Sequence, residues 1–156
     1  MSNSNDQQKE IVFICTGNTC RSPLAEVIFN DLAQNTDYYA SSAGIAALTG
    51  DYAMMQAIDA AGELSLDLKN HRSRRINPQI LEEAFLLITM TEAQKKRLAE
   101  IYPSCSEKIH AFGEFSGEDI EDPFGSSLDI YRLVAEKLSR GIKIFLNNLQ
   151  ENVDKG

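Results

Sequence analysis

Residues 9–31 read KEIVFICTGNTCRSPLAEVIFND, and this stretch decides the fold. It opens with an apolar run over residues 11–14 that is rich in β-branched and aromatic side chains, which is typical of a strand buried on both faces. Further along, Ser22 and Pro23 suit the N-cap and the first position of a helix. One face of that helix would carry the apolar residues Leu24, Val27, Ile28 and Leu32. The stretch therefore predicts a buried strand, a short loop and a helix, in that order.

The loop between this strand and this helix carries the chemistry. Cys15 ends the apolar run, Gly17 lets the loop turn, and Arg21 stands at the start of the expected helix. Loop amides and a helix N-terminus attract an anion, and a guanidinium group can hold two of its oxygens. The same field favours the thiolate form of a cysteine, which is the nucleophilic form, and Ser22 can donate its hydroxyl to that sulfur. A pocket that holds a tetrahedral phosphate against a thiolate is the active site expected of a phosphatase.

Outward from this stretch, strand-like and helix-like segments alternate along the chain. Apolar strand-like runs lie near residues 11–14, 38–42, 85–90 and 108–112. Helical patterns lie near residues 23–34, 53–62, 92–101 and 127–150. This alternation predicts right-handed crossovers and a parallel sheet that helices cover on both faces. Ligands bind such sheets outside the carboxyl ends of the strands, which is where Cys15 falls.

Length and composition limit the class of protein. We expect a single domain over residues 1–156, with residues 1–8 as a flexible tail. The net charge of −8 argues against nucleic acid or an anionic membrane surface as a partner. No apolar stretch approaches the length of a membrane span, and no hydrophobic signal region opens the chain, so we expect a cytoplasmic protein. The 3 cysteines are an odd number without zinc-site spacing, which fits a reducing compartment and predicts no metal site.

Three further motifs follow the loop: SSAG at residues 41–44, HRSR at 71–74 and EDPF at 121–124. Together with residues 15–22, they make the chain resemble the low-molecular-weight protein tyrosine phosphatases over nearly its whole length. The resemblance implies a three-layer α/β fold whose four parallel strands lie in the flavodoxin-like order 2-1-3-4. It also implies a phosphorylated protein as substrate, a cysteinyl-phosphate intermediate, no cofactor, and phosphate or other oxyanions as competing ligands.

The resemblance also gives roles to individual residues. It makes Cys15 the nucleophile and Arg21 the side chain that binds the phosphoryl oxygens. Asp122 becomes the general acid and then the general base, although an isolated aspartate before a proline would more often be a solvated turn residue. The phosphate-binding loop implied by the resemblance also contains Thr16, Gly17, Asn18, Thr19, Cys20 and Ser22.

Two features around the loop have a second interpretation. Ser42 and His71 match a hydrogen-bond network that, with Asn18, braces the loop in this family, whereas an isolated His71 would more often be an exposed loop residue. Cys20 is either a partner for a reversible Cys15–Cys20 disulfide that protects the nucleophile, or a small buried packing residue.

Thr19 bears on which phosphorylated side chain is the substrate. The phosphotyrosine enzymes of the family usually carry an aliphatic residue at this position, whereas the bacterial protein arginine phosphatases share the threonine, whose hydroxyl can meet a guanidinium group. Phe124, followed by a glycine, replaces a pair of tyrosines common in the eukaryotic phosphotyrosine members. Leu48 or Ala47 falls near the position where some of those members place an aromatic wall for the phenol ring. We therefore predict phosphoarginine as the substrate, with phosphotyrosine as the alternative.

Two functions of other kinds are weaker alternatives. Arsenate reduction coupled to thioredoxin requires paired cysteines on a mobile segment, and Cys105 alone is a poor substitute for such a pair. A phosphoprotein-binding module without catalysis would be expected to lack the nucleophile or the acid, and both Cys15 and Asp122 are present. Turnover of a generic aryl phosphate would separate an enzyme from such a module.

Overall fold

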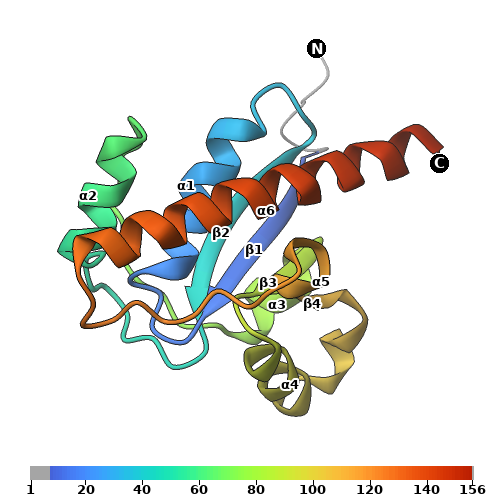
Figure 1. Ribbon diagram of the computed structural model, residues 1–156. Helices are drawn as coiled ribbons and strands as arrows, with labels where there is room; N and C mark the ends of the chain where they lie inside the picture. Colours follow the sequence, from blue (N-terminus) through green and yellow to red (C-terminus); the bar gives the residue numbers. More distant parts are fainter. Residues whose placement is uncertain (1–7, 156) are drawn as a thin grey trace.

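The computed structural model describes residues 8–155, so the tail expected over residues 1–8 lies outside the described residues except for Gln8. Four strands form one parallel sheet in the order β2-β1-β3-β4. They are β1 (Lys9–Cys15), β2 (Tyr38–Gly44), β3 (Leu86–Thr89) and β4 (Ile109–Ala111). The predicted α/β class and the predicted strand order 2-1-3-4 are therefore confirmed (Figure 1).

Helices pack on both faces of the sheet, as the alternation of segments predicts. On one face, Ile11 and Phe13 share a core with α1 (Arg21–Leu32), α2 (Met55–Glu63) and α6 (Leu128–Lys155). On the other face, Val12 and Ile14 share a core with α3 (Pro78–Glu83) and α4 (Glu92–Ile101). All four of these β1 side chains are fully buried, because successive residues of a strand point to opposite faces and both faces are covered. In Figure 1, α6 crosses in front of β1 and β2.

Three short elements of the structure were absent from the prediction. These are α3, α5 (Gly113–Ser116) and a 3₁₀ helix over Pro103–Lys108. With 6, 4 and 6 residues, they are too short to show a helical period in the sequence. The start of α3 follows local rules instead, because the side chain of Asn77 accepts a hydrogen bond from the Ile80 amide at 2.9 Å. Within residues 8–155, no helix combines the length and the apolarity that crossing a membrane requires.

The start of α1 also differs from the prediction. Helix α1 begins at Arg21, so Ser22 and Pro23 lie inside its first turn. The Ser22 hydroxyl does not cap the helix; it lies 2.8 Å from Cys15 Sγ and accepts a hydrogen bond from Asn18 Nδ2. The prediction of Ser22 as N-cap and Pro23 as the first helical residue was therefore wrong. Proline is tolerated in this turn because its missing N–H would have no partner inside the helix.

Gly44 brings the end of β2 against the loop that follows β1. Cys15 and Gly44 face each other at the ends of their strands, and the amides of Ile45 and Ala46 donate to the carbonyls of Cys15 and Thr16 at 2.9 Å. A Cβ atom on Gly44 would lie only 2.6 Å from the Thr16 carbonyl oxygen. Only glycine permits this approach, which fixes the loop to the carboxyl end of the sheet.

Gly141 provides a first test of the packing between α6 and Phe112, the residue that precedes α5. A Cβ atom at this position would lie 2.4 Å from two carbons of the buried Phe112 ring. We expect Gly141→Ala to lower the free energy of unfolding, because overpacking costs about 1–3 kcal/mol and this clash lies at the upper end. That cost exceeds the gain of about 1 kcal/mol that alanine brings to a helix. Urea unfolding of the variant and the parent measures the difference.

The matched control is the same substitution at Gly62 in α2, where a Cβ atom would meet no heavy atom within 4 Å. Gly62→Ala should leave stability unchanged or raise it by up to about 1 kcal/mol, since only helix propensity changes. A stabilising effect of Gly141→Ala would contradict the close packing of α6 on Phe112.

Candidate active site

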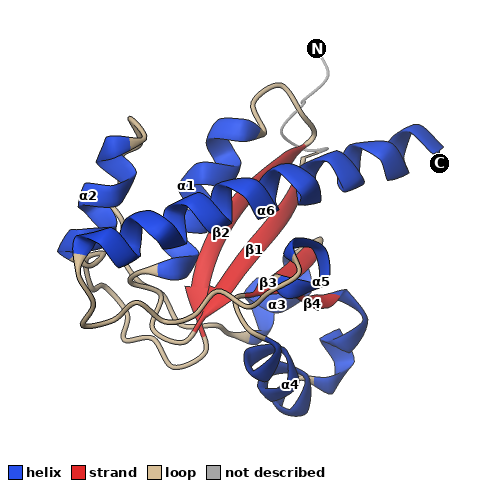
Figure 2. Ribbon diagram, viewed as in Figure 1, coloured by secondary structure: helices blue, strands red, loops and turns tan. Residues whose placement is uncertain are grey.

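The loops that follow β1 and β2 meet at the carboxyl end of the sheet, the end toward which the strand arrows point in Figure 2. Strand β1 lies between β2 and β3, so the chain leaves it at the point where the strand order reverses. Ligand sites of open α/β sheets form at such points. A pocket of about 250 Å³ opens there, lined by Cys15, Thr16, Gly17, Asn18, Thr19, Cys20, Arg21, Asp122 and Phe124.

Cys15 lies at the floor of this pocket with hydrogen-bond donors directed at its sulfur. Its side chain is only 2% exposed. The amide of Asn18 donates to Cys15 Sγ at 3.2 Å, and the Ser22 hydroxyl lies 2.8 Å from the same atom. When the sulfur is a thiolate it can only accept, so the hydroxyl then donates to it. Two donors and the N-terminus of α1 therefore stabilise negative charge on this sulfur.

Asn18 holds the loop in an unusual conformation. Its φ angle is 59°, in the left-handed region that asparagine tolerates better than most residues. Its side-chain amide donates to the hydroxyls of Ser22 at 2.9 Å and Ser42 at 3.0 Å. Its side-chain oxygen accepts from the amide of Arg74 at 2.9 Å, and its backbone carbonyl accepts from Nε2 of His71 at 2.8 Å. The structure thus brings together the polar residues that the resemblance groups around the loop.

Two residues that the sequence analysis did not single out extend this network. Ser42 donates its hydroxyl to Oε1 of Glu26, on α1, at 2.6 Å. Gln94, in the first turn of α4, donates to the hydroxyl of Thr16 at 3.1 Å and is 8% exposed. Gln94 is also the third helical residue of a capping box with Thr91, and that local motif was the only signal in the sequence. Nothing local in the sequence marks Glu26.

Arg21 is almost fully buried beside the pocket, and its guanidinium contacts residues of the opposite wall. Its Nη1 donates to the carbonyl oxygen of Ile120 at 3.0 Å, and its Nη2 lies 3.9 Å from Oδ2 of Asp122. The Asp122 side chain is 56% exposed at the pocket mouth. Its other oxygen accepts the amide of Phe124 at 3.0 Å, and Gly125 follows with a φ angle of 79°. This tight turn places a carboxylate and an aromatic ring at the mouth of the pocket, facing the loop.

Cys20 is buried in the wall of the pocket, next to a helix that arrives from the far end of the chain. Its sulfur lies 3.9 Å from the hydroxyl of Tyr131, which is fully buried on α6. Burial raises the pKa of the Cys20 thiol, and burial also raises the pKa of the Tyr131 hydroxyl. Cys20 is therefore held as a neutral thiol, and its redox role stays a prediction.

The residues expected to set specificity fall in two places. Thr19 is half-buried in the pocket wall, and Phe124 is exposed at the mouth. Leu48 is 74% exposed and does not line the pocket. Its carbonyl accepts a hydrogen bond from the hydroxyl of the buried Ser73. The structure does not bring Leu48 to the other predicted specificity residues. Leu48 could therefore contact only a part of the substrate that extends beyond the pocket.

Comparison with known proteins gives one consistent family. The family model described as low molecular weight phosphotyrosine protein phosphatase matches residues 10–155. A protein-arginine-phosphatase of Bacillus subtilis is 32% identical over 148 residues, which cover 92% of this chain and 98% of the relative. The low molecular weight protein-tyrosine-phosphatase Wzb of Escherichia coli K12 is 33% identical over 134 residues, covering 85% and 90%. A low molecular weight protein tyrosine phosphatase from T. tengcongensis superposes with a TM-score of 0.86 at 36% identity, covering 90% and 99%.

Proposed function

Because this chain belongs to the low molecular weight phosphotyrosine protein phosphatase family and is therefore a phosphatase, we propose that it removes phosphate from arginine side chains of proteins. The observation that carries the proposal is the pocket lining, in which the hydroxyl-bearing Thr19 and the carboxyl group of Asp122 share one pocket with Cys15. The alternative substrate is phosphotyrosine, since a relative named as a tyrosine phosphatase is as similar as one named as an arginine phosphatase.

In the first step, the Cys15 thiolate attacks phosphorus, so that an S–P bond forms while the P–N bond of phosphoarginine breaks. The N–H groups of the loop and of Arg21 hold the three phosphoryl oxygens as charge spreads over them in the transition state. One N–H of Arg21 is used by the Ile120 carbonyl, which leaves four of its five donors for Asp122 and the phosphoryl group. The contact with Ile120 therefore orients the guanidinium without consuming it.

Asp122 supplies the proton that the leaving group needs. Protonated Asp122 donates its proton to the leaving nitrogen as the P–N bond breaks, and arginine departs as a guanidinium ion that keeps the positive charge of the phosphorylated group. The Asp122 carboxylate next accepts a proton from water, whose oxygen attacks phosphorus. The S–P bond then breaks, inorganic phosphate leaves, and the thiolate and the protonated acid are restored. The exposed position of Asp122 at the mouth suits both proton transfers.

Specificity follows from what surrounds the leaving group. A guanidinium group carries several N–H donors, so it gains from the oxygens of a hydroxyl and a carboxyl group in the wall. A phenol ring gains instead from apolar and aromatic area. Thr19 and Asp122 supply the first kind of contact, and among the residues that line the pocket Phe124 is the only aromatic one. This balance favours phosphoarginine.

Two variants of Thr19 test the substrate. Thr19→Val keeps the shape and removes the hydroxyl, so we expect kcat/KM for a phosphoarginine peptide to fall about two- to tenfold, the value of one neutral hydrogen bond of about 0.5–1.5 kcal/mol. Thr19→Ile also adds apolar area, so the ratio of phosphoarginine to phosphotyrosine activity should fall roughly ten- to a hundredfold. Steady-state kinetics on two peptides that differ only in the phosphorylated residue give both values.

The parent protein on the same two peptides is the control. A parent that prefers phosphotyrosine would contradict the proposed substrate, as would an unchanged ratio in Thr19→Ile. Neither result would change the assignment of the chain to the phosphatase family.

Thioredoxin-coupled arsenate reduction finds no support in the arrangement of thiols. Cys105 is buried with Val12 and Ile14 on the face of the sheet opposite α1. Cys15 and Cys20 belong to the core of the α1 face. A resolving thiol must reach the sulfur that carries the adduct, and the sheet separates Cys105 from it.

A further inference from the structure

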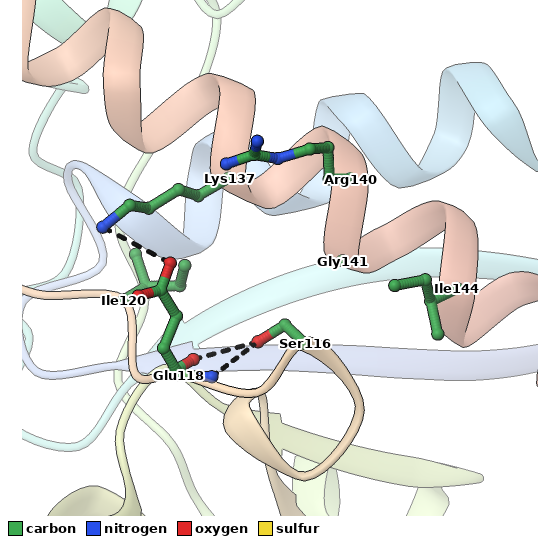
Figure 3. Close-up of a pocket in the computed structure, with 7 residues that line it drawn as sticks. All are labelled: Ser116, Glu118, Ile120, Lys137, Arg140, Gly141 and Ile144. Atoms are coloured by element: carbon green, nitrogen blue, oxygen red, sulfur yellow. Dashed lines mark hydrogen bonds and ion pairs between the residues drawn. The ribbon is translucent and has the colours of Figure 1, made fainter.

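A second pocket lies between α6 and the segment that follows α5. It has a volume of about 190 Å³ and is lined by Ser116, Glu118, Ile120, Lys137, Arg140, Gly141 and Ile144. Figure 3 shows the side chains of α6 above this hollow and the segment of Ser116, Glu118 and Ile120 below it. It shares no lining residue with the pocket of Cys15, so it is a separate cavity.

The walls of this second pocket combine positive charge with apolar surface. Lys137 and Arg140 are three residues apart and therefore lie on the same side of α6. Ile120 is buried beneath them, and the exposed Ile144 stands one turn further along the helix. Gly141 lies between Arg140 and Ile144 in the sequence, where α6 packs closely on Phe112 and Ser116. The pocket thus matches a small molecule with one anionic group and an apolar body.

The present partners of the two cations are weakly held. Lys137 Nζ lies 3.5 Å from Oε1 of Glu118, and Arg140 Nη1 lies 3.6 Å from Oε1 of Glu136. Both distances exceed those of a good charge-assisted hydrogen bond, and three of these four side chains are more than half exposed. Exposed pairs of this kind contribute about 0–1 kcal/mol, so an incoming carboxylate can replace Glu118 at little cost.

We propose that this pocket is a binding site for small apolar carboxylates, distinct from the phosphate pocket. The ligand carboxylate pairs with Lys137 and with the planar fork of Arg140, and its apolar body packs on the exposed Ile144. A carboxylate suits this pair because arginine can bind it through two parallel hydrogen bonds. The proposal rests on this cavity alone and is independent of the substrate of the enzyme.

A single residue, Ile120, connects this pocket to Arg21 of the phosphate pocket. Ile120 donates its amide to the Met90 carbonyl at 2.9 Å and accepts Nη1 of Arg21 at 3.0 Å. The segment under the ligand is therefore tied to Arg21 and leads directly to Asp122. A molecule in this pocket lies beside the residue that orients the Arg21 guanidinium.

The test uses benzoate as the probe and the full-length protein labelled with ¹⁵N. Inorganic phosphate at saturating concentration first fills the pocket of Cys15. Benzoate is then added while the backbone amides of Gly117, Ile120 and Gly141 are followed by NMR. We expect saturable shifts of these amides, and an affinity about tenfold weaker or more in the double variant Lys137→Gln and Arg140→Gln, since a hydrogen bond to a charged group is worth about 1.5–3 kcal/mol.

Lys143→Gln is the matched control, because Lys143 lies on the same helix but lines other cavities. This variant should bind benzoate as the parent does, and thermal unfolding verifies that all variants are folded. The proposal is overturned if benzoate leaves the three amides unshifted in the presence of phosphate, or if the double variant binds it equally well. Because binding is read from chemical shifts, neither of these outcomes depends on the enzymatic activity.

Discussion

Cys15→Ser should reduce hydrolysis of an aryl phosphate by about 10⁴-fold or more, the scale on which removal of a nucleophile acts in other covalent enzymes. A serine hydroxyl at neutral pH is a far weaker nucleophile than a thiolate, and the donors at this position stabilise a thiolate sulfur. Binding of phosphate should persist, because the loop amides and Arg21 are unchanged. Steady-state kinetics and calorimetric titration with phosphate measure the two properties separately.

Cys105→Ser is the matched control for this prediction. It makes the same substitution at another buried cysteine, in the core on the far face of the sheet, and should leave kcat unchanged within about twofold, since no group of the pocket is touched. Substantial turnover in Cys15→Ser would reject the covalent mechanism. Loss of phosphate binding in that variant would show that the substitution disturbs the loop itself.

Asp122→Asn should slow the hydrolysis of poor leaving groups by about 10²–10⁴-fold, the usual contribution of a positioned general acid. An activated phenol departs without protonation, so its release should slow far less. Asparagine retains the side-chain oxygen that accepts the Phe124 amide, so the turn at the pocket mouth is preserved. A series of aryl phosphates whose phenols differ in pKa measures the effect, which appears as a steeper dependence of the rate on the leaving group.

Asp129→Asn is the control for this second variant. Asp129 is an exposed residue at the start of α6 that pairs with Arg132 and lies outside the pocket, so its substitution should leave the leaving-group dependence unchanged. If Asp122→Asn slows activated and poor leaving groups equally, Asp122 contacts the substrate or supports the loop without transferring a proton.

The architecture was predictable because its signals are local. Residues 11–14 form an unbroken apolar run, and the structure buries every one of them in β1. The strand-like runs near 38–42, 85–90 and 108–112 all correspond to strands, and the four long helical patterns correspond to α1, α2, α4 and α6. Period and length were enough for these elements. They were insufficient for α3 and α5, which span fewer than two turns.

The sequence identified most of the residues that line the pocket, but it did not identify the contacts that distant residues make there. Residues 15–21 are consecutive and fold around one point, so a local pattern was sufficient to find them. Leu48 does not line the pocket, and its carbonyl accepts a hydrogen bond from Ser73, 25 residues further along the chain, so its role in specificity stays a prediction. The sequence places Leu48 near the pocket, but it does not show whether the Leu48 side chain points into the pocket.

The sequence by itself determined the strand, the anion-binding loop and the helix, because these depend on side-chain period, on a cysteine and an arginine at fixed spacing, and on backbone geometry. Only the tertiary structure decided which distant groups hold that loop. The strand order brings the ends of β1, β2 and β3 to one edge, and there Gln94 reaches Thr16 while Arg74 reaches Asn18. Likewise, the carbonyl that orients Arg21 belongs to Ile120, 99 residues away. Such contacts depend on how whole helices and strands pack. That packing is determined jointly by the burial of apolar surface and by the connectivity of the chain.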